Sequence, residues 1–497
     1  MSEERALELQ SSTHPSSLIP HLFLFLICTL YLIVAALFAL YTPPWQTPDE
    51  PPHYNYIAQV AANGCCPVIE MGDWKLRYQN QLTSQHFAPE LLGDLNTLQY
   101  EDHQPPLYYL LASVVFRLTN GSLIALRLFS VLISLGVVLS AYGVGRVMYP
   151  ERPWIALSTA ALVAFLPQHV AMMASVNNDG LAEVVIGVTL LATICYLLDD
   201  SARPRIRPWH LGILVGIGLL TKVSTLFLAG VVPLAILLKW WMENKNGVGA
   251  RRILPVQTLL ARLALFLIPA LLLGSIWWLR NLNVYGWPDF LGLGRHNLVV
   301  ADQLRTADKI AAIGWSAYLR EAFWTTFNSF WGQFGWMAVP MPQWIYRAVQ
   351  LLLLVVISGL VIEVAILRKT SKDVVVGRGE PPVRPYVSDT ISPLTRRSAW
   401  LVLGVTLALA LAAFVYYNTE FVQYQGRYLF PGLIPFALLM ALGVDGWRRA
   451  LEYIIGRRRG ASAVRPYLGW LTPTVFLAFA ALDVYLLWRV IVPGLSP

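Results

Sequence analysis

Two adjacent carboxylates, Asp49 and Glu50, lie in a proline-rich stretch that directly follows the first long apolar run of the chain. A carboxylate displayed at a membrane surface can act as a general base that activates an acceptor hydroxyl group. The structural alternative is that Asp49 caps the N-terminus of a short helix. With His53 the pair also has a spacing compatible with a divalent cation, so such an ion stays open as an alternative, although no cofactor is assigned. The chain lacks the paired His/Cys pattern of a zinc site.

Two further polar motifs adjoin apolar segments. His103 and Gln104 stand just before a Pro-Pro pair, which is a favourable helix start, and they would be displayed at the membrane face as donors to a phosphate. Asn178 and Asp179 belong to an Asn-Asn-Asp-Gly sequence. Such a sequence is typical of a tight turn, but it also offers a second acidic group.

Three cations complete the set of candidate residues. Arg280 ends one apolar run, Lys222 lies within another, and Arg427 precedes a third in a Gln-Gly-Arg-Tyr sequence that runs from Gln425 to Tyr428. The two arginines could simply extend toward the membrane interface. Ionisable groups inside a membrane are costly, however, which favours a function for Lys222 in particular. Acids and cations together suggest transfer of a group from a lipid phosphate, which arginine can grip with two nitrogen atoms.

The composition sets the class of protein that holds these residues. Of 497 residues, 56% are hydrophobic and 13% are charged, and the mean hydropathy is +0.54. This is about half the charge of an average soluble protein. The net charge of +8 does not indicate nucleic-acid binding, because the Lys and Arg residues cluster in short loops between apolar runs. The chain is therefore predicted to be an all-α polytopic membrane protein.

Apolar runs long enough to cross a bilayer occur throughout the chain. One of them, 209–238, is too long for a single helix and is predicted to form two short helices that turn near Lys222 to Thr225. This gives about eleven crossings, in a bundle without a soluble catalytic domain. The predicted spans are 18–41, 122–148, 154–175, 180–198, 209–238, 258–279, 344–367, 399–417, 429–446 and 467–491.

The distribution of charge predicts the orientation. The segment 368–397 has seven Lys/Arg against three acids, whereas 42–104 has eight acids and two basic residues. Basic loops stay in the cytoplasm, so the long loops 42–121 and 280–343 are placed outside, together with the C-terminus. The expected organisation is a cytoplasmic tail 1–17, a transmembrane catalytic module 18–446 containing a cytoplasmic linker 368–398, and a part 447–497 with a cytoplasmic basic loop and the last span.

The outer loops are expected to contain short helices at the membrane surface. Helical spacing of apolar residues predicts one over 49–62, another over 105–118, and an aromatic interfacial helix within 302–331. Cys65 and Cys66 are adjacent, a position in which an unstrained disulfide is difficult, so no disulfide framework is expected. Gly212 and Gly216 have the spacing of a helix-packing motif.

The order of these motifs resembles the GT-C glycosyltransferase superfamily, which includes polyprenyl-phosphate-dependent transferases of mannose and aminoarabinose. The resemblance covers residues 20–445 and is closest to a bacterial family of GT-C-like membrane proteins. It rests on short elements whose order and spacing provide the specificity: Pro48-Asp49-Glu50-Pro51-x-His53, a His-x-Pro-Pro-Leu-Tyr-Tyr element from His103, Gln168-His169-Val170 with Asn177-Asn178-Asp179, Phe330 to Trp336, and Gln425-Gly426-Arg427-Tyr428.

The resemblance implies a GT-C bundle with interfacial helices in the first outer loop, in a bacterial plasma membrane. It implies that Asp49 is the general base, with Glu50 in support. The expected partners are a polyprenyl-phosphate-linked sugar, an acceptor outside the cytoplasm and the lipid bilayer. In the superfamily the residue before Pro-Pro is often Lys or His. Here Gln104 intervenes after His103, which departs from that pattern.

Two other classes of function remain open from the sequence. A transporter or flippase of lipid-linked saccharide could use the same charges for binding alone. The location of the polar groups at one face argues against a carrier, whose site lies near the midplane. A non-catalytic membrane subunit would not depend on Asp49 at all.

Overall fold

The computed structural model describes residues 15–199, 205–246, 254–375, 391–455 and 468–496. Of the predicted tail 1–17, residues 1–14 lie outside the described ranges. Residues 376–390 of the linker 368–398 and residues 456–467 of the basic loop also lie outside them. Within the described ranges, α16 extends to Val375, α17 begins at Pro393, and the module boundary predicted at 446 falls inside α18.

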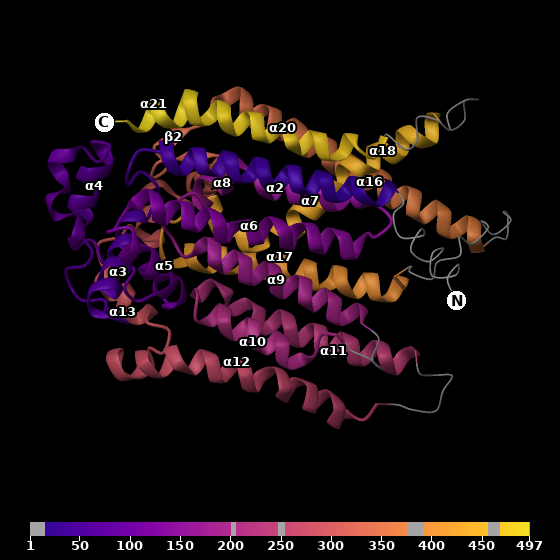
Figure 1. Cartoon of the computed structure of the whole chain (residues 1–497), viewed down its shortest axis with the longest axis horizontal. Coiled ribbons are helices and arrows are strands. Elements are labelled where there is room, and N and C mark those ends of the chain that lie inside the picture. The colour runs from indigo at the N-terminus through magenta and orange to yellow at the C-terminus, as the bar shows by residue number, and fades with distance from the viewer. Residues whose placement is uncertain (1–14, 200–204, 247–253, 376–390, 456–467, 497) are drawn as a thin grey trace, which may run out of the picture.

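The chain is an all-α membrane protein, built as a bundle of long helices (Figure 1). Its lengthwise elements are α2 (Pro15–Tyr41), α6 (Leu123–Met148), α7 (Pro153–Phe165), α8 (Pro167–Met173), α9 (Asp179–Leu198), α10 (Pro208–Leu219), η2 (Val223–Phe227), α11 (Leu228–Asn246), α12 (Val256–Tyr285), α16 (Gln343–Val375), α17 (Pro393–Glu420), η4 (Gly426–Gly432), α18 (Leu433–Ile455), α20 (Leu471–Leu486), the π-helical turn η6 (Leu487–Ile491) and α21 (Val492–Leu495).

Nine helices in the described part of the chain are long and apolar enough to cross a membrane. The bent pair α7 and α8, which meet at 64° just before Pro167, raises this number to ten. Proline disfavours helical geometry in the residue before it, which explains the break. The predicted division of 209–238 is confirmed, because α10 ends at Leu219 and η2 follows Lys222. With 12 residues, α10 is shorter than a usual span, so the expected eleven crossings exceed the nine or ten that qualify.

The Gly212–Gly216 motif brings α10 against α12. A Cβ atom on Gly212 would clash with the carbonyl oxygen of Phe266, and one on Gly216 would lie 2.7 Å from the side chain of Leu273. Small residues allow such close approach of two backbones in a membrane.

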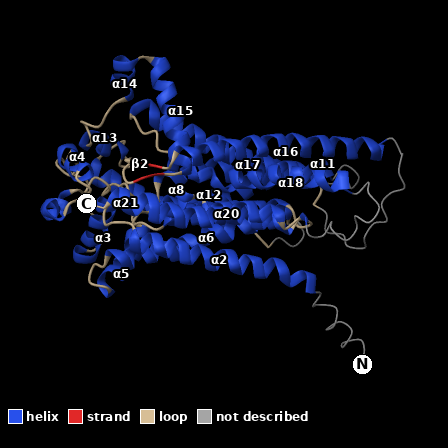
Figure 2. Cartoon of the chain, turned by 90° about the horizontal axis from the view of Figure 1, so that it is seen from above, coloured by secondary structure: helices blue, strands red, loops and turns tan. Residues whose placement is uncertain are grey.

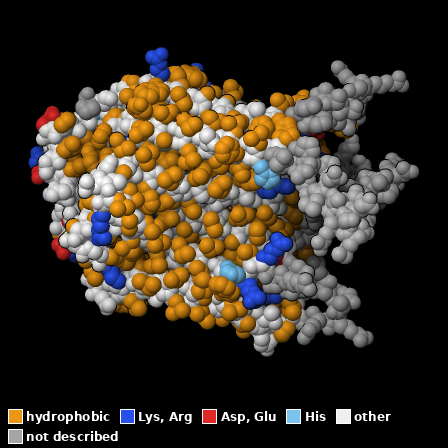
Figure 3. Space-filling model, in the orientation of Figure 1, with side chains coloured by type: hydrophobic (Ala, Val, Ile, Leu, Met, Phe, Trp, Pro, Cys, Tyr) orange, Lys and Arg blue, Asp and Glu red, His pale blue; other side chains and the backbone are white. Residues whose placement is uncertain are grey.

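Figure 3 shows the surface of the whole bundle. Hydrophobic side chains cover the middle of the visible face, and most charged side chains lie toward its ends.

Both long loops lie at one end of the bundle, next to α21 and opposite the start of α2 (Figure 1). This agrees with the prediction that the loops and the C-terminus share a side; which side faces outward stays a prediction. The predicted helices over 49–62 and 105–118 are confirmed as α3 and α5. The loops contain α3 (Glu50–Asn63), α4 (Leu76–Ser84), η1 (Pro89–Thr97), α5 (Leu107–Leu118), α13 (Leu293–Val299), α14 (Thr306–Ile313), α15 (Trp315–Trp331) and the antiparallel pair β1 (Gln333–Phe334) and β2 (Val339–Pro340).

The aromatic helix expected within 302–331 is two helices. Gly314 breaks the segment with a φ of 77°, a conformation that glycine adopts without penalty. As Figure 2 shows, α14 and α15 project away from the side of the bundle. The exposed side chains of Trp315, Leu319 and Phe323 form an apolar face on α15.

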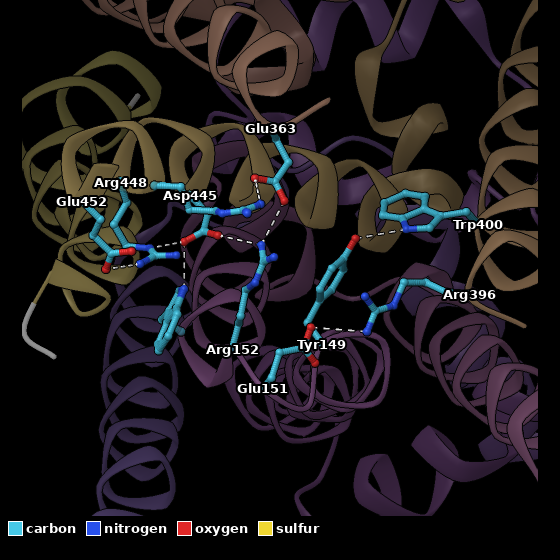
Figure 4. Close-up of polar contacts among 11 residues, drawn as sticks. Tyr149, Glu151, Arg152, Glu363, Arg396, Trp400, Asp445, Arg448 and Glu452 are labelled. Atoms are coloured by element: carbon cyan, nitrogen blue, oxygen red, sulfur yellow. Dashed lines mark hydrogen bonds and ion pairs between the residues drawn. The ribbon is translucent and has the colours of Figure 1, made fainter. Parts of the chain in front are cut away.

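The opposite end of the bundle is held by a network of ion pairs, drawn in Figure 4. Asp445 of α18 is fully buried and accepts hydrogen bonds from Arg152 and Trp154 as well as from Arg448. Arg152 also contacts Glu363 of α16, at 3.0 Å. Because Arg152 precedes α7 and Trp154 belongs to it, the network ties the start of α7 to α16 and α18.

Candidate active site

Asp49 does not cap α3 through its side chain, so the structural alternative for this residue is wrong. Its backbone has a φ of 64°, which is unusual for a residue other than glycine. The carboxylate contacts residues outside α3 instead. Oδ1 accepts a hydrogen bond from the hydroxyl of Tyr100 at 2.8 Å, and Oδ2 forms an ion pair with Arg427.

Arg427 reaches Asp49 from the other end of the sequence, because η4 begins where the chain passes very close to α15. Gly426 donates its N–H to Ser329 Oγ at 2.8 Å, and a Cβ atom at this glycine would clash with the backbone of Phe330. The Arg427 side chain is 6% exposed and lies beside the ring of Tyr428. The motif thus places a buried cation on the Asp49 carboxylate.

Asp179 and Lys222 form a second ion pair, at 2.5 Å, with side-chain exposures of 25% and 17%. Asp179 is the first residue of α9, and Lys222 follows the end of α10. Asp179 also interacts electrostatically with Arg427. The two predicted acids and two of the predicted cations are therefore parts of one cluster, which we call the acid–cation cluster (Asp49, Asp179, Lys222 and Arg427).

The charges around Asp49 determine its protonation. Burial alone would raise the pKa of Asp49, but the Arg427 guanidinium and the Tyr100 hydroxyl outweigh burial and hold this pKa below its ordinary value. Asp49 is consequently an ionised carboxylate at neutral pH. Both of its oxygen atoms are occupied by Tyr100 and Arg427.

His53 and Glu101 adjoin the cluster. His53 is buried one helical turn after Asp49, and its Nδ1 lies 2.8 Å from the Tyr109 hydroxyl. Burial lowers the pKa of His53, against the opposing effect of Glu101. Burial raises the pKa of Glu101, although the nearby His53 opposes that rise.

The side chains of Gln104 and Asn178 form hydrogen bonds with residues around the cluster. The Gln104 side chain hydrogen bonds with Glu101, and its Oε1 lies 3.4 Å from the Asn178 amide nitrogen. The same nitrogen lies 3.3 Å from the carbonyl oxygen of Thr221, the residue before Lys222. The Oδ1 atom of Asn178 is buried without a hydrogen-bond partner among the described residues. Both residues therefore link the loop 42–121 to the ends of α9 and α10.

Glu50, expected to support Asp49 in catalysis, points elsewhere. It is fully buried and accepts hydrogen bonds from Arg127 Nε at 2.7 Å and Arg127 Nη2 at 2.6 Å. The backbone N–H groups of Trp45 and Val176 donate to the same carboxylate. With both of its oxygen atoms occupied, Glu50 has a structural role.

Three other predicted substrate-binding residues lie outside the acid–cation cluster. Arg280 donates to the carbonyl oxygens of Cys66 and Pro67 and stacks on Trp277. His103 packs against His296, with ring centroids 4.4 Å apart, and burial lowers the pKa of His103. The Gln425 side chain donates to Gln423 at 3.1 Å. Of the remaining candidates, Tyr428 borders the cluster through Arg427.

The sulfur atoms of the adjacent Cys65 and Cys66 contact each other, while Cys28 and Cys195 are free thiols, so a disulfide framework is not present in the described ranges. Arg280 donates to the carbonyl oxygen of Cys66, so its side chain is directed to this segment and not to the acid–cation cluster. As for metals, no group of three or more His, Cys, Asp or Glu side chains in the described ranges could hold an ion.

Three residues of this region were not assigned from the sequence. Tyr100 gave no signal, because a single tyrosine in a loop is ordinary. Glu101 belongs to the polar motif before Pro-Pro but was passed over for His103 and Gln104. Arg127 lies in an apolar span, where a charge is costly and therefore informative.

Comparison with known proteins identifies the family. Solved structures similar to this chain include ArnT from Cupriavidus metallidurans bound to undecaprenyl phosphate, with 15% identity, a TM-score of 0.41, and coverage of 95% of this chain and 73% of ArnT. The apo structure of the same ArnT has 15% identity and a TM-score of 0.43, with coverage of 97% and 74%. No curated protein matches the sequence. The family model for "Predicted membrane protein (DUF2142)" matches residues 93–437, more than half of the chain. The chain therefore belongs to the DUF2142 family of membrane proteins.

Proposed function

We propose that this protein is a membrane glycosyltransferase that moves a sugar from a polyprenyl-phosphate donor to an acceptor outside the cytoplasm. The observation that carries the proposal is the acid–cation cluster itself. Two carboxylates and two cations from four distant parts of the sequence meet at the end of the bundle that holds both long loops. Such an arrangement supplies both a base and a phosphate-binding site.

The cations are suited to the phosphate of the donor. Arg427 can offer two nitrogen atoms to phosphate oxygens, and Lys222 a point charge. Both stand at the beginning of membrane-spanning segments, where a lipid-borne headgroup would arrive. Their binding would stabilise the charge that develops on the departing polyprenyl phosphate.

Asp49 is the proposed general base. A donor phosphate competes with Asp49 for Arg427, so donor binding would release Oδ2 for the acceptor hydroxyl. The acceptor oxygen then forms a bond to the anomeric carbon, and its proton passes to Asp49. The bond between that carbon and the phosphate oxygen breaks, and its electron pair leaves with the polyprenyl phosphate.

The proposal also covers the membrane in which the protein lies and its orientation. We place the protein in a bacterial plasma membrane, with its N-terminus in the cytoplasm and the acid–cation cluster on the outer face. The charge distribution of the loops supports this orientation. A cysteine scan with a membrane-impermeant label, using exposed Glu90 and Asp94 of η1 as sites, tests it directly.

The enzymatic proposal is tested with the full-length protein in proteoliposomes and a panel of farnesyl-phosphate-linked hexoses and pentoses. The wild type is expected to release farnesyl phosphate from at least one donor. Asp49→Asn should lower this rate by about 10²- to 10⁴-fold, the usual contribution of a general base. Asp94→Asn, an exposed acid of the same loop, is the matched control. Translocation of labelled lipid without release of farnesyl phosphate would instead support a flippase. If neither activity were detected, the result would support a non-catalytic subunit.

A further inference from the structure

The Asp49 carboxylate is held at both of its oxygen atoms. The Tyr100 hydroxyl donates to Oδ1 at 2.8 Å, and Arg427 pairs with Oδ2. The Asp49 side chain is partly exposed, so a substrate can reach it, whereas Tyr100 and the Arg427 side chain are buried. Two buried partners on different oxygen atoms fix the orientation of an accessible carboxylate.

The two partners differ in what happens to them when a phosphate binds. Arg427 is a cation with several N–H donors and can turn toward phosphate oxygens. Tyr100 has a single O–H donor, which is already committed to Asp49. Burial raises the pKa of Tyr100, so its hydroxyl keeps the proton that it donates. Among the described residues, Tyr100 is thus the side-chain partner that Asp49 retains once Arg427 has turned away.

The ring of Tyr100 is embedded in a small apolar cluster between the two long loops. Its other members come from loop 42–121, from the end of α13 and from the segment before η4: Ile69, Val299, Val300 and Phe421. Trp74 packs edge-on against the Tyr100 ring with centroids 4.9 Å apart, and the Trp74 indole N–H donates to Asp302 of the loop 280–343. The two long loops therefore set the position of the Tyr100 hydroxyl together.

The backbone around Tyr100 is fixed as well. The Tyr100 carbonyl oxygen accepts a hydrogen bond from His103 Nδ1 at 3.1 Å, and the His103 ring packs against His296 of α13. Gln99, the preceding residue, donates its N–H to the carbonyl oxygen of Asp73 at 3.0 Å. Ring and backbone contacts together keep the Tyr100 hydroxyl on Asp49.

We propose that Tyr100 is a positioning residue for the base: its hydroxyl keeps Asp49 Oδ1 anchored while the donor phosphate draws Arg427 away from Oδ2. The inference rests on the function proposed above. The released Oδ2 keeps its direction and can accept the proton of the acceptor hydroxyl, while Tyr100 retains its own proton throughout. The loop 280–343 thereby takes part, through the Tyr100 ring, in placing a base that belongs to the loop 42–121.

Tyr100→Phe tests this role, because it keeps the ring in the apolar cluster and removes only the hydroxyl. With the farnesyl-phosphate sugar that the wild type consumes, kcat should fall about 10- to 100-fold and KM for the donor should change little, because misplacement of a reacting group can cost about 10²-fold in rate. Tyr78→Phe is the matched control. Tyr78 lies in the same loop, and its hydroxyl donates to the carbonyl oxygen of Leu91 at 2.6 Å, so this variant should retain wild-type kinetics.

The pH dependence of kcat separates positioning from a general loss of structure. Burial raises the pKa of Asp49, whereas Arg427 and the Tyr100 hydroxyl lower it. A hydrogen bond to the ionised form favours that form, so its loss in Tyr100→Phe should move the acidic limb of kcat to higher pH by about one unit. A partly unfolded sample would lower the rate at every pH and leave the limb in place. Tyr78→Phe should keep the wild-type limb.

Either of two results would overturn the inference while leaving the proposed function intact: a kcat of Tyr100→Phe within about twofold of the wild type, or an acidic limb that does not move. Absence of sugar transfer by the wild type would overturn both.

A second measurement needs no donor. In infrared difference spectra recorded as the pH is lowered, the carbonyl stretch of protonated Asp49 should appear in the wild type and be missing in Asp49→Asn. The midpoint of its appearance should lie at higher pH in Tyr100→Phe and be unchanged in Tyr78→Phe. Equal midpoints in Tyr100→Phe and the wild type would show that the hydroxyl does not act on the Asp49 carboxylate, and would also overturn the inference.

Discussion

Arg127 binds the carboxylate of Glu50 with two nitrogen atoms, at 2.7 and 2.6 Å, and both side chains are almost completely buried. Arg127 also donates to the carbonyl oxygens of Ala39, Thr42 and Pro43. The pair therefore joins α6 to the end of α2 and the start of α3. Glu50, the residue after Asp49, therefore holds the loop that contains Asp49 in place.

Replacing Arg127 by Met should destabilise the protein strongly. The change leaves the Glu50 carboxylate buried without a counter-charge, which costs about 3–5 kcal/mol in comparable cases. Thermal unfolding of the purified protein, followed by tryptophan fluorescence, measures the effect. Arg77→Met is the control, because Arg77 is exposed on α4. Equal unfolding temperatures for the two variants would contradict the assigned role of the pair.

Arg427→Gln should weaken the binding of farnesyl phosphate. A hydrogen bond to a charged group contributes about 1.5–3 kcal/mol, which corresponds to roughly 10- to 150-fold in affinity. Arg427→Lys should lie between this variant and the wild type, because lysine keeps the charge without the planar fork. Arg280→Gln provides the comparison, since Arg280 is occupied by the carbonyl oxygens of Cys66 and Pro67. Isothermal titration with farnesyl phosphate should find Arg280→Gln close to the wild type; a larger loss there than in Arg427→Gln would refute the assignment.

Asp102 should make the protein less stable as the pH rises toward 8. Burial raises the pKa of Asp102 to about 8, and its Oδ1 has no hydrogen-bond partner within the described residues, while Oδ2 accepts from Gln59 at 2.7 Å. Between the ordinary pKa of about 3.9 and this value, the folded state binds more protons than the unfolded state. The free energy of unfolding then falls with pH, by at most about 1.4 kcal/mol per pH unit.

Asp102→Asn removes this titration and keeps an acceptor for Gln59. Unfolding temperatures measured from pH 5 to 8 should therefore fall less in the variant than in the wild type. Asp94→Asn, on the exposed side of η1, should preserve the wild-type slope. Parallel curves for Asp102→Asn and the wild type would show that this carboxyl is ionised throughout the range.

Asp445→Asn should affect stability without affecting the binding of phosphate. The change removes the buried charge that Arg152 and Arg448 share at the opposite end of the bundle from the long loops, at a cost on the order of 3 kcal/mol. Unfolding temperature should fall, while the affinity of the folded fraction for farnesyl phosphate stays unchanged. A matching loss of affinity would mean that the two ends of the bundle are coupled.

Much of the fold follows from the sequence because the bilayer imposes a simple rule on helix length and polarity. The break near Lys222 could be predicted because one apolar run was too long and basic loops flanked it. The break at Gly314 was missed, since the aromatic residues continue through it at helical spacing. The interruption at Pro167 was missed in the same way, within a run that is apolar on both sides.

The candidate site could be predicted in part because charged residues are few in this chain. Asp49, Asp179, Lys222 and Arg427 each stand out against an apolar background, and the structure brings them together. The directions of side chains could not be obtained in this way. Asp49 and Glu50 are adjacent acids, yet Asp49 pairs with Arg427 and Glu50 with Arg127. The partner of Arg280 is a pair of backbone carbonyl groups, which every residue carries.

The Asp49–Arg427 pair also has a consequence for biosynthesis, because its partners are 378 residues apart in the chain. At roughly 5–20 residues per second, translation of the intervening chain takes about 20–75 s. During that interval the nascent protein carries Asp49 without its cation, and most of the helices are inserted before the pair can close. A chain truncated between α3 and η4 therefore keeps Asp49 without its cation, at the end of the bundle that holds the long loops. Cellular quality control could recognise this unpaired charge.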